Sequence, residues 1–418
     1  MATINLRFPA LAFLALAALA SCGDNHAAST GVTYPPVPGC EGIDPTPCDV
    51  RAPECETRLF ALAACLRGDQ TNATPPPVTV ISETDFGAML ATEAAMSTPD
   101  PHRDRWDWAL STVGLIAPGG LSPQAMMTQT VTSILGEYRY KTKDILVIDH
   151  GSSFNEQSAS PVLVHEMVHA LQDREVDLTQ YSSTYSGTQD MWLAADSIVE
   201  GEARMQETRY RASVLGVDPG QVDWMRRFDN SVAVDQAYVL MQPSPLTAST
   251  GTFPYEWGAR YVYDTWTAAG MTMASVHGRF LSPPLTTRVL IASIDQALDP
   301  EAAPATIAAP VPPDSWMPVD GSTMGAWAVF LMLAKLSPTD AQSIALGWQA
   351  DGFWIYDGPA SQGALVWQID LADQPTAARM ATILLPLFGN GNVRQSGARV
   401  VVAKATDGQP LDWAFPAP

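Results

Sequence analysis

The chain has 418 residues and a formal net charge of −21, from 44 acidic and 23 basic side chains. Apolar residues make up 46% of it and charged residues 16%, which excludes a disordered chain and is typical of a globular protein of two or three domains. Nucleic acids and anionic membrane surfaces are bound through clustered Lys and Arg, so the acidic balance argues against both kinds of partner.

The N-terminus predicts export from the cytoplasm. Arg7 precedes the apolar run "FPALAFLALAALAS", which is too short to span a bilayer and is typical of the signal peptide that we expect over residues 1–21. The next residue is Cys22, and "LASC" resembles the signal box of bacterial lipoproteins, in which this cysteine receives diacylglycerol. The resemblance implies an extracytoplasmic chain that a lipid on Cys22 anchors to a bacterial membrane, in the periplasm or at the cell surface. An ordinary secretory signal next to an unrelated cysteine is the alternative.

Four further cysteines predict two disulfides in an oxidising compartment: Cys40, Cys48, Cys55 and Cys65. The stretch "PECETRLFALAACLRGD" has the leucine spacing of a helix, on which Cys55 and Cys65 would lie about 15 Å apart. A disulfide requires Cα atoms within about 7 Å. Cys55 should therefore pair with Cys40 or Cys48. A four-cysteine zinc site is the alternative, but the chain lacks the C-x-x-C spacing typical of such sites.

Proline and glycine divide the rest of the chain. We expect a tether and disulfide-stapled segment over residues 22–77, a mainly helical domain over 78–300, a linker over 301–320 and a small α+β domain over 321–418. The predicted fold class is α+β, with a small sheet before the helix that carries the motif described below.

Hydrophobic periodicity places the elements. We predict helices in chain order over residues 102–116, 122–138, 161–174, 190–216 and 255–270, and two strands within 137–149, the second being Asp144–Asp149. In the C-terminal part we predict helices over 324–336, 339–349 and 376–388, and strands over 352–358, 363–372, 398–405 and 410–415.

The stretch "VLVHEMVHALQD" at residues 162–173 contains His165-Glu166-x-x-His169. Histidines four apart share one face of a helix, so both imidazoles can bind one Zn²⁺. Glu166 is rotated by about 100° from His165, which suits a general base. The other residues of the helix are apolar almost all round, so we expect it to be buried. Two core histidines bonded to carbonyl or carboxylate oxygens are the alternative.

With this motif the chain resembles the gluzincin branch of the zincin metallopeptidases. In that branch a glutamate on a later helix is the third ligand, and "SIVEGEARMQE" supplies Glu200 in the expected Glu-Gly-x-Ala pattern. Glu202 is the competing acid, but two residues on a helix differ by about 200°, so both cannot face one metal. The metzincin branch would place a glycine and a third histidine soon after His169, and neither is present. Zincins also have a strand before the motif, and we expect "DILVID" to be an edge strand that pairs with a peptide.

The segment also looks like a mostly uncharacterised bacterial gluzincin-like family. That family continues the motif as His-Ala-Leu-Gln-Asp and carries Pro-Tyr-x-x-Gly and Pro-Pro-x-Ser/Thr-Thr segments. Here these are "PYEWG" (254–258) and "PPLTT" (283–287). Arg288 and Val289 follow the latter in place of the family's acidic and amide residues.

The resemblance implies a zinc-dependent, lipid-anchored metallopeptidase that acts on a peptide or protein substrate. Glu166 would be the general base, and Tyr255 or His277 would stabilise the oxyanion, with Tyr255 preferred because it lies in "PYEWG". Asp173 or Asp196 could hydrogen-bond a ligand histidine and fix its tautomer. Two alternatives stay open: a zinc-binding but catalytically inactive surface or assembly lipoprotein, and a structural lipoprotein without metal.

Overall fold

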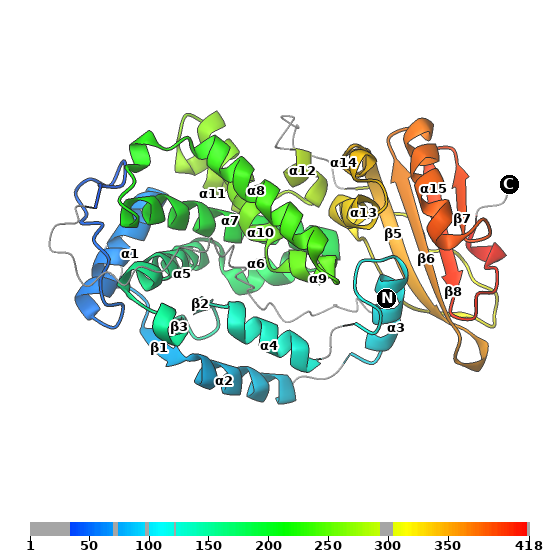
Figure 1. Cartoon of the computed structure of the whole chain (residues 1–418), viewed down its shortest axis with the longest axis horizontal. Coiled ribbons are helices and arrows are strands. Elements are labelled where there is room, and N and C mark those ends of the chain that lie inside the picture. Colours follow the sequence, from blue (N-terminus) through cyan, green and yellow to red (C-terminus); the bar gives the residue numbers. More distant parts are fainter. Residues whose placement is uncertain (1–33, 70–73, 97–99, 121–122, 293–303, 416–418) are drawn as a thin grey trace.

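The computed structural model describes residues 34–69, 74–96, 100–120, 123–292 and 304–415, which form a mixed α+β protein (Figure 1). The predicted signal peptide and Cys22 lie outside these residues. No helix within the described ranges combines the length and the apolar character needed to cross a membrane.

Fifteen helices are present in the described part of the chain. They are α1 (Pro53–Arg67), α2 (Glu83–Met96), α3 (Arg103–Thr112), α4 (Pro123–Ser133), α5 (Glu156–Val176), α6 (Leu178–Tyr185), α7 (Gln189–Val214), α8 (Trp224–Met241), α9 (Pro245–Thr250), α10 (Phe253–Ala268), α11 (Met273–Leu281), α12 (Thr287–Ala292), α13 (Gly325–Ala334), α14 (Pro338–Leu346) and α15 (Gln374–Phe388). The strands are β1 (Val78–Ser82), β2 (Gly136–Arg139), β3 (Asp144–Asp149), β4 (Met317–Ser322), β5 (Trp348–Asp357), β6 (Gly363–Leu371), β7 (Val393–Ser396) and β8 (Arg399–Ala405).

The smaller sheet has the order β1-β3-β2, with β1 parallel and β2 antiparallel to β3. The predicted strand Asp144–Asp149 is therefore present, but the prediction that it is an edge strand is wrong. Its four inner residues are all buried, because they are apolar without alternation and the strand packs on both faces. The edge strand beside the predicted metal helix is β2.

The helix α5, which carries the motif, lies inside the helical body of the molecule, with α1, α7 and the small sheet packed around it (Figure 1). One hydrophobic cluster joins α1, α5 and α7 and includes Leu59, Leu62, Leu163, Met167 and Tyr210. The predicted segment 22–77 and the predicted domain 78–300 thus share one core at this point. The stapled segment is a packed part of the body.

The two disulfides join Cys40 to Cys65 and Cys48 to Cys55. The expected helix forms as α1, so the exclusion of a Cys55–Cys65 bond is confirmed. These bonds fix the two ends of α1 to the loop that precedes it. Disulfides of this kind are consistent with an extracytoplasmic location.

The larger sheet is antiparallel with the order β4-β5-β6-β8-β7. Helices α13, α14 and α15 bury one face of it, and the segment around Leu411 and Phe415 packs on the other. The predicted linker ends inside β4. The prediction of a strand over 410–415 is wrong, because Asp412–Ala414 forms a short 3-10 turn. This part also packs on the helical body, where Trp327 of α13 contacts Phe253 and Trp257 of α10.

Candidate metal centre

Two well-capped helices position the three predicted metal ligands. The helix α5 begins after Asn155, which accepts a hydrogen bond from the Ser158 backbone in a capping box, and it is buried continuously from Ala159 to Asp173. The helix α7 begins after Thr188, whose hydroxyl accepts from the Met191 backbone. The two helices pack together, so a side chain near the middle of α7 meets the histidine face of α5.

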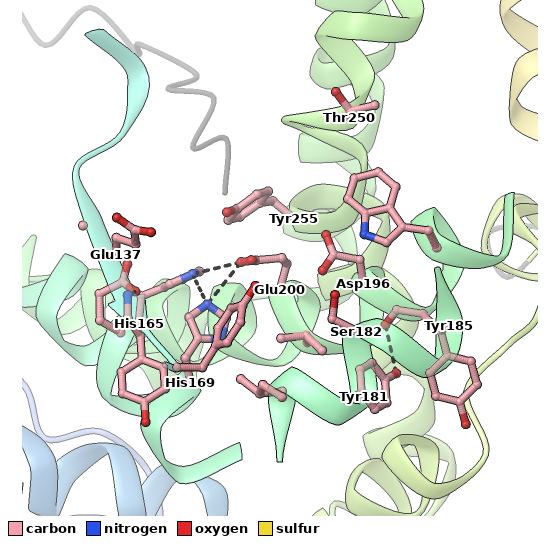
Figure 2. A pocket seen from close by; sticks show the side chains of 18 residues that line it. Glu137, His165, His169, Tyr181, Ser182, Tyr185, Asp196, Glu200, Thr250 and Tyr255 are labelled. Atoms are coloured by element: carbon pink, nitrogen blue, oxygen red, sulfur yellow. Dashed lines mark hydrogen bonds and ion pairs between the residues drawn. The ribbon is translucent and has the colours of Figure 1, made fainter. Parts of the chain in front are cut away.

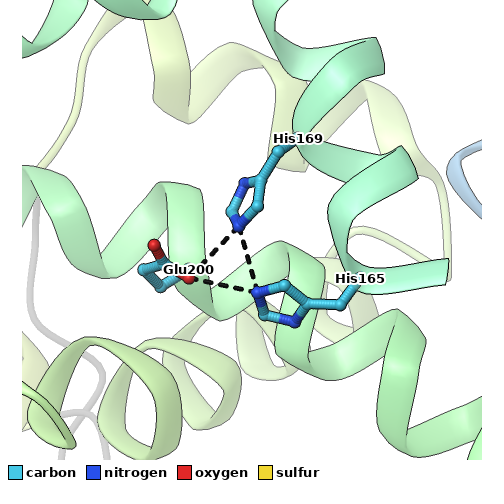
Figure 3. A group of neighbouring side chains, drawn as sticks. All are labelled: His165, His169 and Glu200. Atoms are coloured by element: carbon cyan, nitrogen blue, oxygen red, sulfur yellow. Dashed lines mark hydrogen bonds and ion pairs between the residues drawn. The ribbon is translucent and has the colours of Figure 1, made fainter. Parts of the chain in front are cut away.

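His165, His169 and Glu200 converge from these helices on one point (Figure 3). The two Nε2 atoms lie 3.0 Å apart, and Glu200 Oε2 lies 3.2 Å from each of them. Ligands at the usual zinc distance of about 2.0–2.1 Å in a tetrahedron lie about 3.3 Å from one another. The three atoms thus form a triangle of nearly the size that one face of a zinc tetrahedron requires.

The charges around the triangle also suit a cation. Burial opposes the charged form of His165, but the carboxylates of Glu200 and Glu207 outweigh it and raise its pKa to about 10. Burial likewise opposes a charge on His169, yet the Glu200 carboxylate raises its pKa. For Glu200 the two imidazoles outweigh burial and hold its pKa far below the usual range. The Glu200 and Glu207 carboxylates thus compensate positive charge at the two imidazoles, and the donor set of two nitrogens and one carboxylate oxygen fits Zn²⁺.

Glu166 is held beside the triangle but does not belong to it. It is buried, and its carboxylate accepts a hydrogen bond of 2.7 Å from the backbone N–H of Tyr138 on β2. A Cβ at Gly136 would lie 2.9 Å from Glu166 Oε1, so the glycine lets the strand approach this carboxylate. Burial, only partly offset by His165 and His169, raises the pKa of Glu166. A carboxyl group with a raised pKa beside a metal site can accept and return a proton.

Tyr255 lies at the same site. Its ring stacks on the His165 ring with centroids 5.7 Å apart, and the residue is buried on α10 and lines the cavity. Burial and the charge of Glu200 raise its pKa well above the usual value, so its hydroxyl remains a donor. The other candidate, His277 of α11, is not at the cavity, since its nitrogens lie 3.8 Å from Glu175 and 3.7 Å from Glu202.

The two aspartates expected behind the histidines have other surroundings. Asp173 accepts hydrogen bonds from the Tyr138 hydroxyl and the Leu178 backbone and pairs with Lys143, so its prediction as a histidine partner is wrong. These groups reach it because the strands and α6 pack beside that end of α5. Asp196 lines the cavity one turn before Glu200, and no hydrogen bond to either histidine is found among the described residues. Burial and the charge of Glu200 raise the pKa of Asp196 to about 8.

Two residues that were not predicted lie beside the Nδ1 atoms of His165 and His169, the nitrogens that face away from the triangle. His169 Nδ1 lies 2.8 Å from Gln172 Oε1, and His165 Nδ1 lies 3.3 Å from Glu207 Oε2. Neither residue was predicted from the sequence. Their spacing carried a signal, since Gln172 is one turn beyond His169 and Glu207 is two turns beyond Glu200 on the same helix face.

The metal triangle opens into a cavity shown in Figure 2. One side is aromatic, with Tyr181, Tyr185 and Trp192, and the other carries Glu137 of β2. Lysine and arginine are absent from the described lining. Burial and the charge of Glu166 raise the pKa of Glu137 to about 7. Apart from the two histidines and the tyrosines, the ionisable side chains of the described lining are therefore all carboxyl groups.

Comparison of the chain with known protein families, with curated proteins and with solved structures found no match.

Proposed function

We propose that the chain is a zinc-dependent hydrolase of peptide bonds, with His165, His169 and Glu200 as the zinc ligands. The observation that carries the proposal is the buried triangle of two imidazole nitrogens and one carboxylate oxygen beside a separate buried glutamate. Zinc in such a site, when bound, would act as a Lewis acid that polarises a carbonyl group and lowers the pKa of water.

Glu166 supplies the proton transfer in this proposal. It takes the proton from the attacking water and delivers it to the amine that leaves. Its raised pKa and its fixed position on the Tyr138 N–H support this role. A carboxyl group that the backbone holds in place loses little freedom when the reaction begins.

Tyr255 donates a hydrogen bond to the oxyanion that forms at the attacked carbonyl. Its stacking on His165 keeps the hydroxyl beside the ligands, and its raised pKa keeps the proton on the oxygen. Donors aimed at a developing charge in a site that excludes water stabilise the transition state strongly.

The substrate main chain binds along β2. This strand is at the edge of its sheet, and Gly136, Glu137 and Tyr138 line the cavity, so an extended peptide could pair with the backbone groups of this edge other than the Tyr138 N–H, which donates to Glu166. The side chains of the peptide would then alternate between the aromatic wall and solvent.

We also propose that the enzyme works outside the cytoplasm, anchored through lipid on Cys22. The two disulfides support the compartment. Mass spectrometry of the N-terminal peptide from membranes checks the anchor, because a lipid-modified Cys22 must be its first residue.

The decisive experiment measures zinc content and peptide cleavage on the same preparations. We expect one zinc per chain in wild type and in Glu166→Gln, with cleavage of a peptide library only in wild type. Glu156→Gln is the matched control, since Glu156 is an exposed residue in the first turn of the same helix. Equal cleavage by wild type and Glu166→Gln contradicts the proposal. Zinc without cleavage in wild type would support the inactive surface lipoprotein instead.

A further inference from the structure

The stapled helix α1 ends in an arginine that is buried among three carboxylates. Arg67 is 1% exposed and lies two residues after Cys65 of the Cys40–Cys65 disulfide. Its Nε donates to Glu202 at 3.0 Å, and its terminal nitrogens pair with Asp69 at 2.6 Å and Glu175 at 2.9 Å. Burial opposes the charge of Arg67, but Glu202 and Asp69 outweigh it and raise its pKa, so it remains charged.

Glu202 connects this arginine to a metal ligand. Its other oxygen, Oε2, accepts a hydrogen bond of 2.9 Å from Gln172 Nε2, and Gln172 Oε1 faces His169 Nδ1 at 2.8 Å. All the linking side chains are buried, with Glu202 and Gln172 both 0% exposed. A continuous series of hydrogen bonds therefore runs from Arg67 on α1 through Glu202 on α7 to His169 on α5.

The direction of these hydrogen bonds is fixed. The Gln172 amide group donates to two acceptors, Glu202 Oε2 and the Val199 carbonyl, so its oxygen has to face His169. An oxygen at that place accepts only if His169 carries its proton on Nδ1. In the neutral, ligating form of His169 the lone pair is then on Nε2, which faces Glu200 and His165.

The other histidine does not depend on α1. His165 Nδ1 lies beside Glu207, which Arg204 and Arg211 of the same helix hold in its ionised form. The two ligands are thus oriented by separate sets of residues, one local to α7 and one that includes the disulfide-stapled segment.

We propose that Arg67 is a positioning residue of the metal centre, and that the stapled segment completes the site by fixing the ligating tautomer of His169 through Glu202 and Gln172. This inference rests on the metal site of the proposed function but not on peptide cleavage. Loss of such outer partners typically weakens metal binding by about 10–100-fold.

The first test measures zinc affinity by competition with a chromophoric chelator. Arg67→Met removes the charge at similar length, and we expect it to weaken zinc binding by about 10–100-fold in the folded protein. Arg58→Met is the matched control, since Arg58 is on the same helix and pairs with the exposed carboxylate of Asp44. It should bind zinc as wild type does. Nitrogen-15 NMR of the zinc-free proteins, at a pH high enough to make His169 neutral, should show its Nδ1–H form in wild type and a mixture of tautomers in Arg67→Met.

The second test keeps Arg67, so it can still show whether Glu202 and Gln172 orient His169 if Arg67→Met does not fold. Gln172→Glu sets two buried carboxylates against each other, and Glu202→Gln removes the charge that holds the Gln172 amide, so each should weaken zinc binding by about 10–100-fold. In the double variant the amide at position 202 donates to the carboxylate at position 172, which still accepts from His169. The double variant should bind zinc about tenfold more tightly, or better, than the single variant with the lower zinc affinity.

Three results overturn the inference. Wild-type affinity in folded Arg67→Met is one, and a double variant that binds no better than the single variants is another; in both cases the metal site itself stands. A wild-type protein that binds no zinc removes the metal centre and this inference together.

Discussion

Gly201 of α7 and Gly258 of α10 touch where the two helices cross. A Cβ at Gly201 would lie 2.3 Å from the Gly258 carbonyl carbon, and a Cβ at Gly258 would lie 2.2 Å from the Ser197 carbonyl oxygen. Gly201 directly follows Glu200, and Gly258 lies about one turn after Tyr255. This contact therefore sets the separation between a metal ligand and the proposed oxyanion donor, which explains the glycines of "EGEA" and "PYEWG".

Gly258→Ala should accordingly destabilise the protein and weaken zinc binding. The added methyl group meets backbone atoms that cannot rotate away, so the helices must separate, at a cost of about 1–3 kcal/mol or more. Gly278→Ala in α11 is the control, because a Cβ there meets nothing within 4 Å. It should be neutral or stabilise the helix by up to about 1 kcal/mol. Urea unfolding measures both variants, and equal free energies of unfolding would contradict the close contact.

Tyr255→Phe should reduce kcat and leave zinc affinity unchanged. The ring can still stack on His165, while the oxyanion loses one donor, which in other enzymes lowers kcat by about 100–1,000-fold. Tyr263→Phe is the matched control, since Tyr263 is also buried on α10 but does not line the cavity. A normal kcat in Tyr255→Phe would remove this residue from the proposed mechanism.

Local pattern was enough to predict the helices α5, α7 and α10 and the strands β2 and β3, because each is an apolar or periodic segment of suitable length between turn and breaker residues. Helical spacing also placed His165 and His169 on one face, whereas the choice of Glu200 as their partner came from the family resemblance, and the structure brings the three together. The apolar run of β3 itself indicates a central strand. Four consecutive buried residues without alternation are typical of a central strand.

The environment of the ligands could not be predicted in the same way. Arg67 lies 135 residues before Glu202, and only the packing of α1 on α5 and α7 brings the two together. Asp173 had the right spacing for a histidine partner, but Tyr138 and Lys143 compete for its carboxylate from elements outside the helix. Spacing identifies which side chains share a face, while tertiary packing decides which partner each of them takes.

The Cys40–Cys65 disulfide should contribute more stability than Cys48–Cys55. It closes a loop with a sequence separation of 25, against 7 for the other bond. In the chain-entropy account the longer loop stabilises by about 3.5 kcal/mol and the shorter one by about 1 kcal/mol less. Unfolding of the two paired Cys→Ser variants in urea tests this order, and a larger loss for Cys48–Cys55 would contradict it.

Asp235 should make the stability of the protein fall as pH rises. This residue of α8 is 5% exposed, and its Oδ2 has no hydrogen-bond partner among the described residues. Burial raises its pKa to about 7, with the nearby Glu256 adding to the effect and Thr252 opposing it. In the unfolded chain its pKa is 3.8. Between these two pH values the folded state binds one more proton than the unfolded state. The contribution of Asp235 to the free energy of unfolding is therefore fully present below about pH 4 and is lost as pH rises through about 7.

Asp235→Asn removes this dependence because an amide does not titrate. The free energy of unfolding of Asp235→Asn minus that of wild type should increase from about pH 4 to about pH 8. The increase is at most about 4 kcal/mol, because each unit of pKa difference corresponds to about 1.36 kcal/mol. Asp314→Asn, which changes an exposed carboxylate in the segment before β4, should follow wild type across the range. Chemical denaturation at several pH values measures all three proteins. If the difference between Asp235→Asn and wild type is constant with pH, then Asp235 is ionised in the folded protein throughout, and a cation or water must compensate its charge.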